Sequence, residues 1–213
     1  MLKKILLNGK RIPVPVPIKT LSEAIAWVEK HLLRPDHMIT RIQLNGDELE
    51  VGGPFPATVL QDEADLRLKI DSPTDICVQT IDALRNLASV ISRNLKPIAV
   101  QLWEHKGNRL PLEAKTVMED IGLMVELFDH VLVLVDKKVD TTNALDLQQK
   151  IRKASALLQI ALQQTDFKGV ARVLLNQLET PVIDLSSELS SLEKSVFEIQ
   201  ADRHLEKRQA KIG

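Results

Sequence analysis

Apolar residues in the last two thirds of the chain recur at alternating steps of four and three residues, in four separate series. The series run from Cys77 to Leu102, from Val117 to Val135, from Leu147 to Ala161 and from Ala171 to Ile199. A mean period of 3.5 residues is typical of helices that pack along a shared left-handed seam. The pattern therefore predicts an antiparallel four-helix bundle with short connecting loops.

The fourth series is the longest, and it contains the candidate surface for a partner. It consists of Ala171, Leu175, Leu178, Val182, Leu185, Leu189, Leu192, Val196 and Ile199. At about 1.5 Å per residue, the first and fourth helices should exceed the inner two by roughly 10–20 Å. The outer pair either covers its own excess length or exposes an apolar stripe, which is typical of an interaction surface. We expect a homodimer or a partner protein along this pair, at Leu189, Leu192, Val196 and Ile199.

Two prolines, Pro97 and Pro181, fall inside the first and fourth series. Proline removes a helical hydrogen bond, so each one is expected to kink or break its helix. Antiparallel packing would bring the two interruptions to nearby levels, which predicts either a hinge or a packing adjustment. Thr180 followed by Pro181 also fits the start of a new helix, with the threonine as its cap.

The first 73 residues carry a different pattern, in which short alternating segments are separated by turn residues. Seven of the ten prolines and four of the eight glycines lie here, and both residue types interrupt helices. Strands are predicted at 3–7, 11–18, 39–44, 48–51 and 66–70, with a helix from Thr20 to about Leu33. Asn-Gly pairs at 8–9 and 45–46 predict tight turns, because both residue types tolerate a positive φ. The sequence thus predicts an α+β protein with domains at 1–72 and 73–213.

Polar residues lie at the expected starts of three helices. Thr20 and Glu23 have the spacing of a capping box, in which each side chain binds the backbone of the other. A residue within 140–142 is the expected cap of the third bundle helix, and Asp166 is the expected cap of the fourth.

The order of hairpin, helix, strand, short strand and strand resembles that of β-grasp, or ubiquitin-like, domains over residues 5–70. The Leu-Asn-Gly turns at 7–9 and 44–46 resemble the small sulfur-carrier type in particular. Such carriers end in a free Gly-Gly carboxylate, whereas here the chain continues after Ile70 through Asp71, Ser72 and Pro73. The resemblance therefore implies a β-grasp domain used as a docking surface.

A second resemblance covers the segments 157–167, 170–174 and 178–181. They are similar to a helical hairpin of uncharacterised bacterial proteins whose genes are often associated with flagellar or motility clusters. In that hairpin an acidic–aromatic pair, here Asp166 and Phe167, joins the helices, and a proline interrupts the second one. This resemblance implies a role in a bacterial assembly.

Composition and charge exclude several classes of protein. The chain has 28 basic and 29 acidic residues and only six aromatic ones, so neither a basic surplus nor a set of stacking rings favours nucleic-acid binding. Segment 40–71 carries a local charge of −4, and the tail 203–211 carries a local charge of +3. The acidic segment 40–71 is either a face for a basic partner or a solvated loop. No apolar run approaches the roughly 20 residues of a membrane span, and no secretory signal is recognisable. A cytoplasmic protein is expected.

No motif in the chain indicates an enzyme. The predicted seams lack the inward Glu-x-x-His pairs that would hold a metal or heme in a bundle, and the histidines lack zinc spacing, so we expect no cofactor and no metal. Cys77, the single cysteine, is expected to be a buried thiol; the alternative is a nucleophile. The sequence favours a non-enzymatic interaction protein, adaptor or chaperone. The alternatives are an accessory subunit of an enzyme and an enzyme with scattered catalytic residues.

Overall fold

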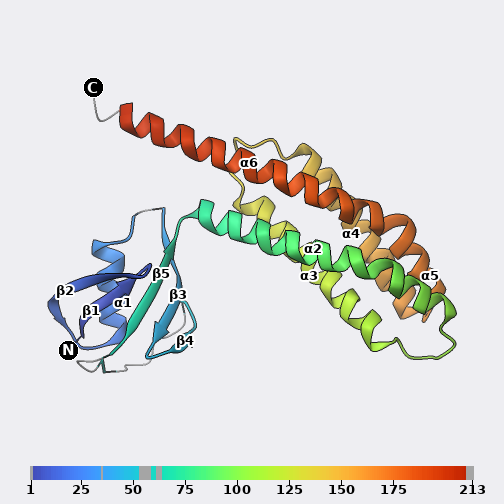
Figure 1. Ribbon diagram of the computed structural model, residues 1–213, viewed down its shortest axis with the longest axis horizontal. Coiled ribbons are helices and arrows are strands. Elements are labelled where there is room, and N and C mark those ends of the chain that lie inside the picture. Colours follow the sequence, from blue (N-terminus) through green and yellow to red (C-terminus); the bar gives the residue numbers. More distant parts are fainter. Residues whose placement is uncertain (1, 35, 53–58, 61–63, 210–213) are drawn as a thin grey trace. The chain divides into compact units, whose positions relative to one another are not determined.

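The protein is α+β, with a mixed five-stranded sheet in the first third and helices in most of the remainder (Figure 1). The computed structural model describes residues 2–34, 36–52, 59–60 and 64–209, of which 3, 15, 16 and 202–209 are described by their backbone alone. The chain divides into two compact units, Met1–Asp75 and Ile76–Gly213. The boundary falls three residues beyond the predicted one.

The sheet contains strands at the predicted places. They are β1 Leu2–Leu7, β2 Lys10–Ile18, β3 Met38–Leu44, β4 Asp47–Leu49 and β5 Leu66–Asp71. The strand order is β2-β1-β5-β3-β4, in which β1 and β5 are parallel and all other neighbours are antiparallel. β4 ends two residues earlier than predicted. Residues 53–58 of the expected loop, and Asp62 and Glu63 of the acidic segment, lie outside the described residues.

Helix α1, Leu21–His31, packs against one face of the sheet. The predicted capping box is confirmed, because the Glu23 N–H donates to the Thr20 hydroxyl and the Thr20 N–H donates to the Glu23 carboxylate. The core between helix and sheet includes Ile5, Ile18, Leu21, Ile25, Val28, Ile42, Leu66, Leu68 and Ile70. Both predicted Asn-Gly turns are present with positive φ at all four residues.

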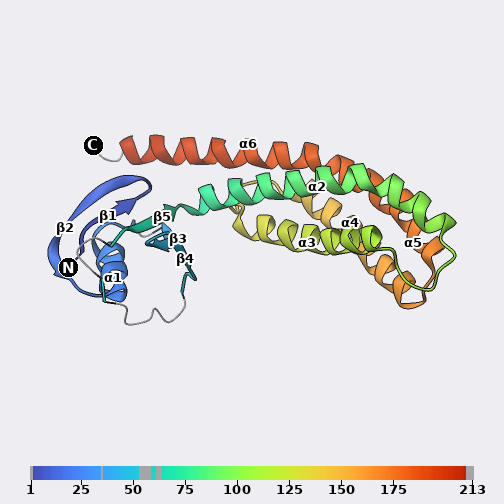
Figure 2. The same ribbon diagram turned by 60° about the horizontal axis from the view of Figure 1, so that its bottom comes forward.

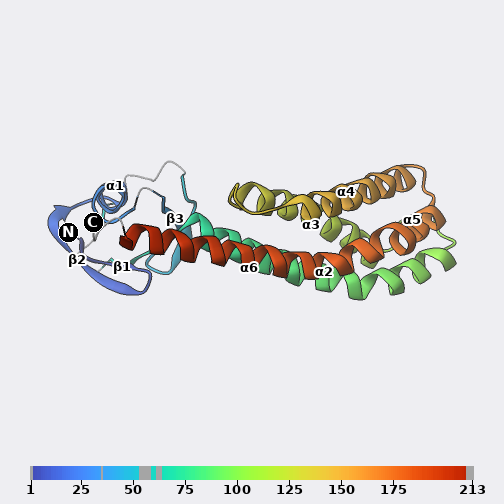
Figure 3. The ribbon, with the colours of Figure 1, turned by 90° about the horizontal axis from the view of Figure 1, so that it is seen from above.

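The second unit consists of helices that run antiparallel in sequence order (Figure 2). They are α2 Pro73–Glu104, α3 Leu112–Leu134, α4 Thr142–Gln163, α5 Phe167–Val173, the π-helical turn η1 Leu174–Leu178, and α6 Glu179–Gln209. The last three form one continuous helix. α4 contacts both α3 and α6 (Figure 3), and one hydrophobic core runs through the whole set. Every predicted position in the first three seams is buried.

In the fourth seam, one predicted position is exposed and the last, Ile199, is half-buried. Leu175 was expected inside, but its side chain is 36% exposed, whereas Leu174 is 0% exposed. The cause is η1, in which the Glu179 N–H donates to the carbonyl of Leu174, five residues back. A π turn adds one residue to the helix and so moves the buried face by one position.

Neither proline ends its helix, which excludes a break at Pro97 or Pro181 and a new helix start at Thr180. α2 continues through Pro97 and α6 through Pro181. The ring of Pro181 crowds the carbonyl four residues back, at Gln177, and Gln177 lies within the widened turn η1. The π turn thus gives a physical reason why the helix tolerates this proline.

Two ion pairs fix the register of α2 against α6. Arg85 Nη2 lies 2.6 Å from Glu193 Oε2, and Lys96 Nζ lies 2.8 Å from Glu179 Oε1. Pro97 follows Lys96 directly, and Pro181 lies two residues beyond Glu179. The two prolines therefore lie at nearby levels, as antiparallel packing predicts.

The helix starts use short polar side chains. Asp166 accepts the Gly169 N–H at 2.8 Å, which confirms the predicted cap. Before α4, the Asp140 carboxylate accepts the Thr142 N–H at 3.0 Å. At α2, Ser72 and Asp75 bond reciprocally, with the Asp75 N–H donating to the Ser72 hydroxyl and the Ser72 N–H to the Asp75 carboxylate. This Ser-Pro-Thr-Asp start was not predicted, although its spacing and its proline are recognisable in the sequence.

Glu188 of α6 lies close enough to Asp140 for the two charges to interact. Burial raises the pKa of the Glu188 carboxyl, and the negative charge of Asp140 raises it further. Hydrogen bonds from the Thr142 N–H and hydroxyl lower the pKa of Asp140. Asp140 is therefore already ionised when Glu188 titrates, and the two carboxylates repel each other at neutral pH.

Glu188→Gln should stabilise the helical unit at neutral pH. A carboxyl whose pKa is raised in the folded state binds its proton more tightly there, so stability falls as the pH rises through that pKa. The stability difference between Glu188→Gln and wild type should grow from pH 4 to pH 7 and vanish below the ordinary glutamate pKa of about 4.3. Thermal denaturation across this range measures it, with the exposed Glu126→Gln as the charge-matched control. A difference that is flat with pH, or equal in the control, would contradict the repulsion.

Candidate functional site

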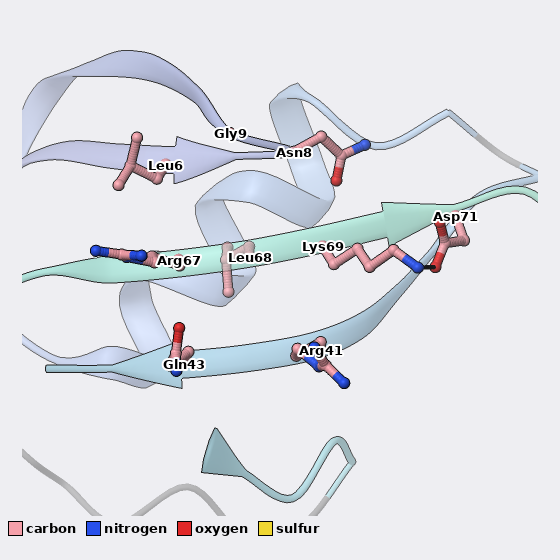
Figure 4. A pocket seen from close by; sticks show the side chains of 9 residues that line it. All are labelled: Leu6, Asn8, Gly9, Arg41, Gln43, Arg67, Leu68, Lys69 and Asp71. Carbon is pink, nitrogen blue, oxygen red and sulfur yellow. Dashed lines mark ion pairs between the residues drawn. The ribbon is translucent and has the colours of Figure 1, made fainter. Parts of the chain in front are cut away.

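The face of the sheet opposite α1 carries a shallow hollow among charged side chains (Figure 4). We call this surface the open face. The hollow has a volume of about 630 Å³. It is lined by Leu6, Asn8, Gly9, Arg41, Gln43, Arg67, Leu68, Lys69 and Asp71. These residues come from β1 and the turn after it, from β3 and from β5.

Strand alternation places the cations on this face. In β5, Leu66, Leu68 and Ile70 are buried toward α1, so the residues between them project to the other side. Arg67 lies between Leu6 of β1 and Gln43 of β3, and Lys69 lies beside Arg41. The same alternation adds Lys4, and pairing with Leu6 adds Arg11 of β2.

The Asn8 side chain fixes the edge of the hollow. Its amide accepts the Ile70 N–H at 2.8 Å and donates to the Ile70 carbonyl at 2.9 Å. The side chain thereby acts as one more peptide group in the parallel pairing of β1 with β5. This contact also explains the positive φ of 48° at Asn8, because the short amide side chain can stabilise that conformation locally.

The charges on the open face are partly paired. Arg67 donates from Nε and Nη2 to Asp65 at 2.9 and 2.7 Å, and Arg41 Nε lies 3.1 Å from Glu48. The hydrogen bond from Arg67 lowers the pKa of Asp65, and the charges of Lys4 and Arg11 act in the same direction.

Lys69 pairs with Asp71 at 2.9 Å. Within the described part of the chain, no carboxylate lies within ion-pairing distance of Lys4 or Arg11. The open face thus has a surplus of positive charge, although segment 40–71 is acidic as a whole.

The sequence-predicted surface residues lie elsewhere and are mostly covered. Leu189, Leu192 and Val196 are buried, and Ile199 is half-buried. The Arg85–Glu193 ion pair places α2 beside this part of α6, and the buried side chains of the two helices belong to one core. The sequence left two alternatives: the outer helices cover each other's excess length, or they expose an apolar stripe. The burial of these side chains supports the first.

The two prolines and Cys77 offer no site chemistry. Pro97 is exposed and Pro181 half-buried, on neighbouring helices. Burial raises the pKa of the Cys77 thiol to about 11. The thiol is therefore protonated at neutral pH, which favours an unreactive buried thiol over a nucleophilic thiolate.

The titratable clusters form local contacts. His37 Nδ1 lies 2.9 Å from Asp36, and His105 Nε2 lies 2.8 Å from the Arg109 carbonyl. Asp129 binds Arg152 and Gln148 on α4. Among the residues that the structure describes, no group of three His, Cys, Asp or Glu could hold a metal ion.

The comparisons with known proteins add no family to this picture. No family model, no curated protein and no solved structure matches the chain. Over the described residues, no helix is both long and apolar enough to cross a bilayer. Sequence reasoning missed Arg41, Arg67 and Leu6 as surface residues. The signal was present, because the alternation in 66–70 that predicts the strand also places Arg67 and Lys69 on the face away from the core.

Proposed function

We propose that the protein is a non-enzymatic adaptor that binds a protein partner through the open face. The observation that carries the proposal is the cationic surplus around Leu6 on a sheet face that α1 leaves uncovered. Binding surfaces commonly combine a small apolar centre with a charged rim. The partner that fits is a polypeptide segment carrying carboxylates around an apolar side chain.

We further propose that the first unit is a β-grasp domain and the second a four-helix bundle. The strand order β2-β1-β5-β3-β4, in which the parallel pair β1 and β5 is flanked by antiparallel neighbours, supports the first assignment. The sequential antiparallel helices and their single core support the second. A β-grasp domain that continues into a bundle is suited to docking, because its carboxyl end is not free for activation.

The geometry of the open face favours a macromolecular partner over a small ligand. The hollow is shallow, and its polar groups are already engaged: Asn8 binds Ile70, and Arg67 binds Asp65. Small-ligand sites instead enclose most of the ligand's surface. A protein partner needs only side chains that reach the exposed rim.

Charge reversal on the open face tests the proposal. The double variant Arg41→Glu/Arg67→Glu and the control Lys30→Glu/Arg34→Glu change the net charge equally, but the control residues lie in α1 and just after it. Each full-length protein is used for affinity capture from the source cells, with partners quantified by mass spectrometry. The principal partner is then purified and titrated against all three proteins.

We expect the open-face variant to weaken binding at least tenfold and the control to leave it within twofold. Far-ultraviolet circular dichroism verifies that each variant is folded. A partner that binds the open-face variant as tightly as wild type, or that both variants weaken equally, would overturn the proposal.

A further inference from the structure

A second exposed surface follows the line where α2 lies beside α5, η1 and α6 (Figures 1 and 2). We call it the basic strip. Its members are Arg93, Val100 and Trp103 of α2 together with Lys168, Arg172 and Ile183 of the facing helix, and all six are exposed. It belongs to the helical unit alone and is separate from the open face.

Trp103 marks one end of the basic strip. Its side chain is 50% exposed, and Lys168 Nζ and Arg172 Cζ lie 5.8 and 6.0 Å from its ring centroid. These are cation–π distances, so two cations on α5 hold a large aromatic surface at the outside of the helices. An exposed tryptophan between cations is unusual for an inert surface, since tryptophan and arginine are enriched in binding hot spots.

From Trp103 the basic strip extends toward the start of α2, along side chains that helical spacing places on the same face. Val100 lies one turn before Trp103, and the Lys96–Glu179 ion pair at 2.8 Å sets the level of the facing helix. Beyond it, a hollow of about 440 Å³ is lined in part by Arg93 of α2 and Ile183 of α6. The two helices thus flank a groove whose lining includes basic, apolar and small polar side chains.

The cations of the strip are available for a partner. Arg93 Nε donates to the Ser89 carbonyl at 3.2 Å, a bond that leaves its charge uncompensated. Among the described residues, no carboxylate lies within ion-pairing distance of Arg93, Lys168 or Arg172. The net charge of the whole chain is −1, so this concentration of positive charge is local.

We propose that the basic strip binds an acidic amphipathic helix of a partner protein. Two antiparallel helices present a groove that accepts a third helix by ridge-into-groove packing. Val100, Trp103 and Ile183 would contact its apolar side, and the cations would pair with its carboxylates.

Two other occupants fit less well. In a two-fold dimer built strip on strip, the cations Arg93, Lys168 and Arg172 of one copy would face cations of the other copy, and like charges would oppose each other. A nucleic acid would find a single exposed ring for stacking along the strip, Trp103. Charge complementarity thus selects an acidic helix.

A displayed peptide library tests the chemistry of the occupant. The library contains 20-residue helices with leucine fixed at alternating steps of three and four, and all other positions are random except that tryptophan is excluded. It is selected on the full-length protein, and the best peptide is titrated by tryptophan fluorescence in a Trp27→Phe background, in which only Trp103 reports. We expect enrichment of Glu and Asp and a shift of Trp103 emission on binding.

Matched variants locate the bound peptide. Arg93→Glu/Arg172→Glu should weaken binding at least tenfold, whereas Lys138→Glu/Lys153→Glu, with the same charge change, should alter it less than twofold. The open-face variant Arg41→Glu/Arg67→Glu should also leave it unchanged, so this test is independent of the proposed function.

Several results would overturn the assignment. They are selection without acidic enrichment, binding that Arg93→Glu/Arg172→Glu does not weaken, and loss of binding in the open-face variant. Light scattering that shows a dimer dissociated by Arg93→Glu/Arg172→Glu would assign the strip to a second copy and would equally overturn it.

Discussion

Replacing Leu174 with alanine should destabilise the helical unit by about 2–5 kcal/mol, the usual cost of truncating a buried leucine. The same substitution at Leu175, the next residue, should cost less than about 1 kcal/mol, because truncation of an exposed side chain leaves no cavity. Leu174 is 0% exposed and Leu175 is 36% exposed. Urea denaturation of the two variants, followed by circular dichroism, measures both values.

This pair of variants tests the π turn directly. The regular heptad of the sequence predicts the opposite order, with Leu175 inside and Leu174 outside. The two substitutions remove the same atoms from adjacent positions of one helix, so each is the control of the other. Equal losses, or a larger loss at Leu175, would show that the helix is regular at 174–178.

The second large effect should follow from truncation of Phe128. This ring is the largest fully buried side chain of the helical core, at 0% exposure. Phe128→Ala should cost about 3–5 kcal/mol, because it loses the burial of the ring and leaves a cavity that the rigid helices cannot close. Phe128→Leu, which retains most of the volume, should cost appreciably less.

Val133 supplies the control within the same helix. Its side chain is 80% exposed, so Val133→Ala should alter stability by less than about 0.5 kcal/mol. Thermal and urea denaturation of the full chain provide the comparison. If Phe128→Ala and Val133→Ala destabilised the protein equally, Phe128 would not lie at the centre of the core.

The two proposed surfaces lie on different units and have a common chemistry. Each combines exposed cations with an apolar side chain, Leu6 on the open face and Trp103 at one end of the basic strip. An adaptor needs two such surfaces that can be lost separately. The charge-reversal variants therefore test each surface independently: one pair of substitutions tests the open face, and the other tests the basic strip.

Much of the fold could be predicted from local patterns. The Asn-Gly turns, the Thr20 capping box and the Asp166 cap depend on residues close together in the chain, so their sequence signals are direct. The first three seams were also predictable, because a 3.5-residue period allows only one face of each helix to be buried. The Ser72–Asp75 cap has an equally local signal.

The candidate sites were less predictable, because exposure depends on what other elements cover. The sequence of the fourth seam predicts a surface for a partner at Leu189, Leu192 and Val196. In the structure these side chains are buried within the chain itself, beside α2. The open face depends on strand pairing that brings Arg41, Arg67 and Lys4 together from segments far apart in sequence. No local pattern records that pairing.

The sequence by itself determined where the helices, strands and turns lie, because these follow from the period of apolar residues and from the preferences of single residues for φ and for capping. Only the tertiary structure decided which of Leu174 and Leu175 is buried, and which cations gather on one surface. Burial and surface charge depend on contacts between distant segments, such as Lys168 and Arg172 with Trp103, and each such contact needs the positions of two elements at once.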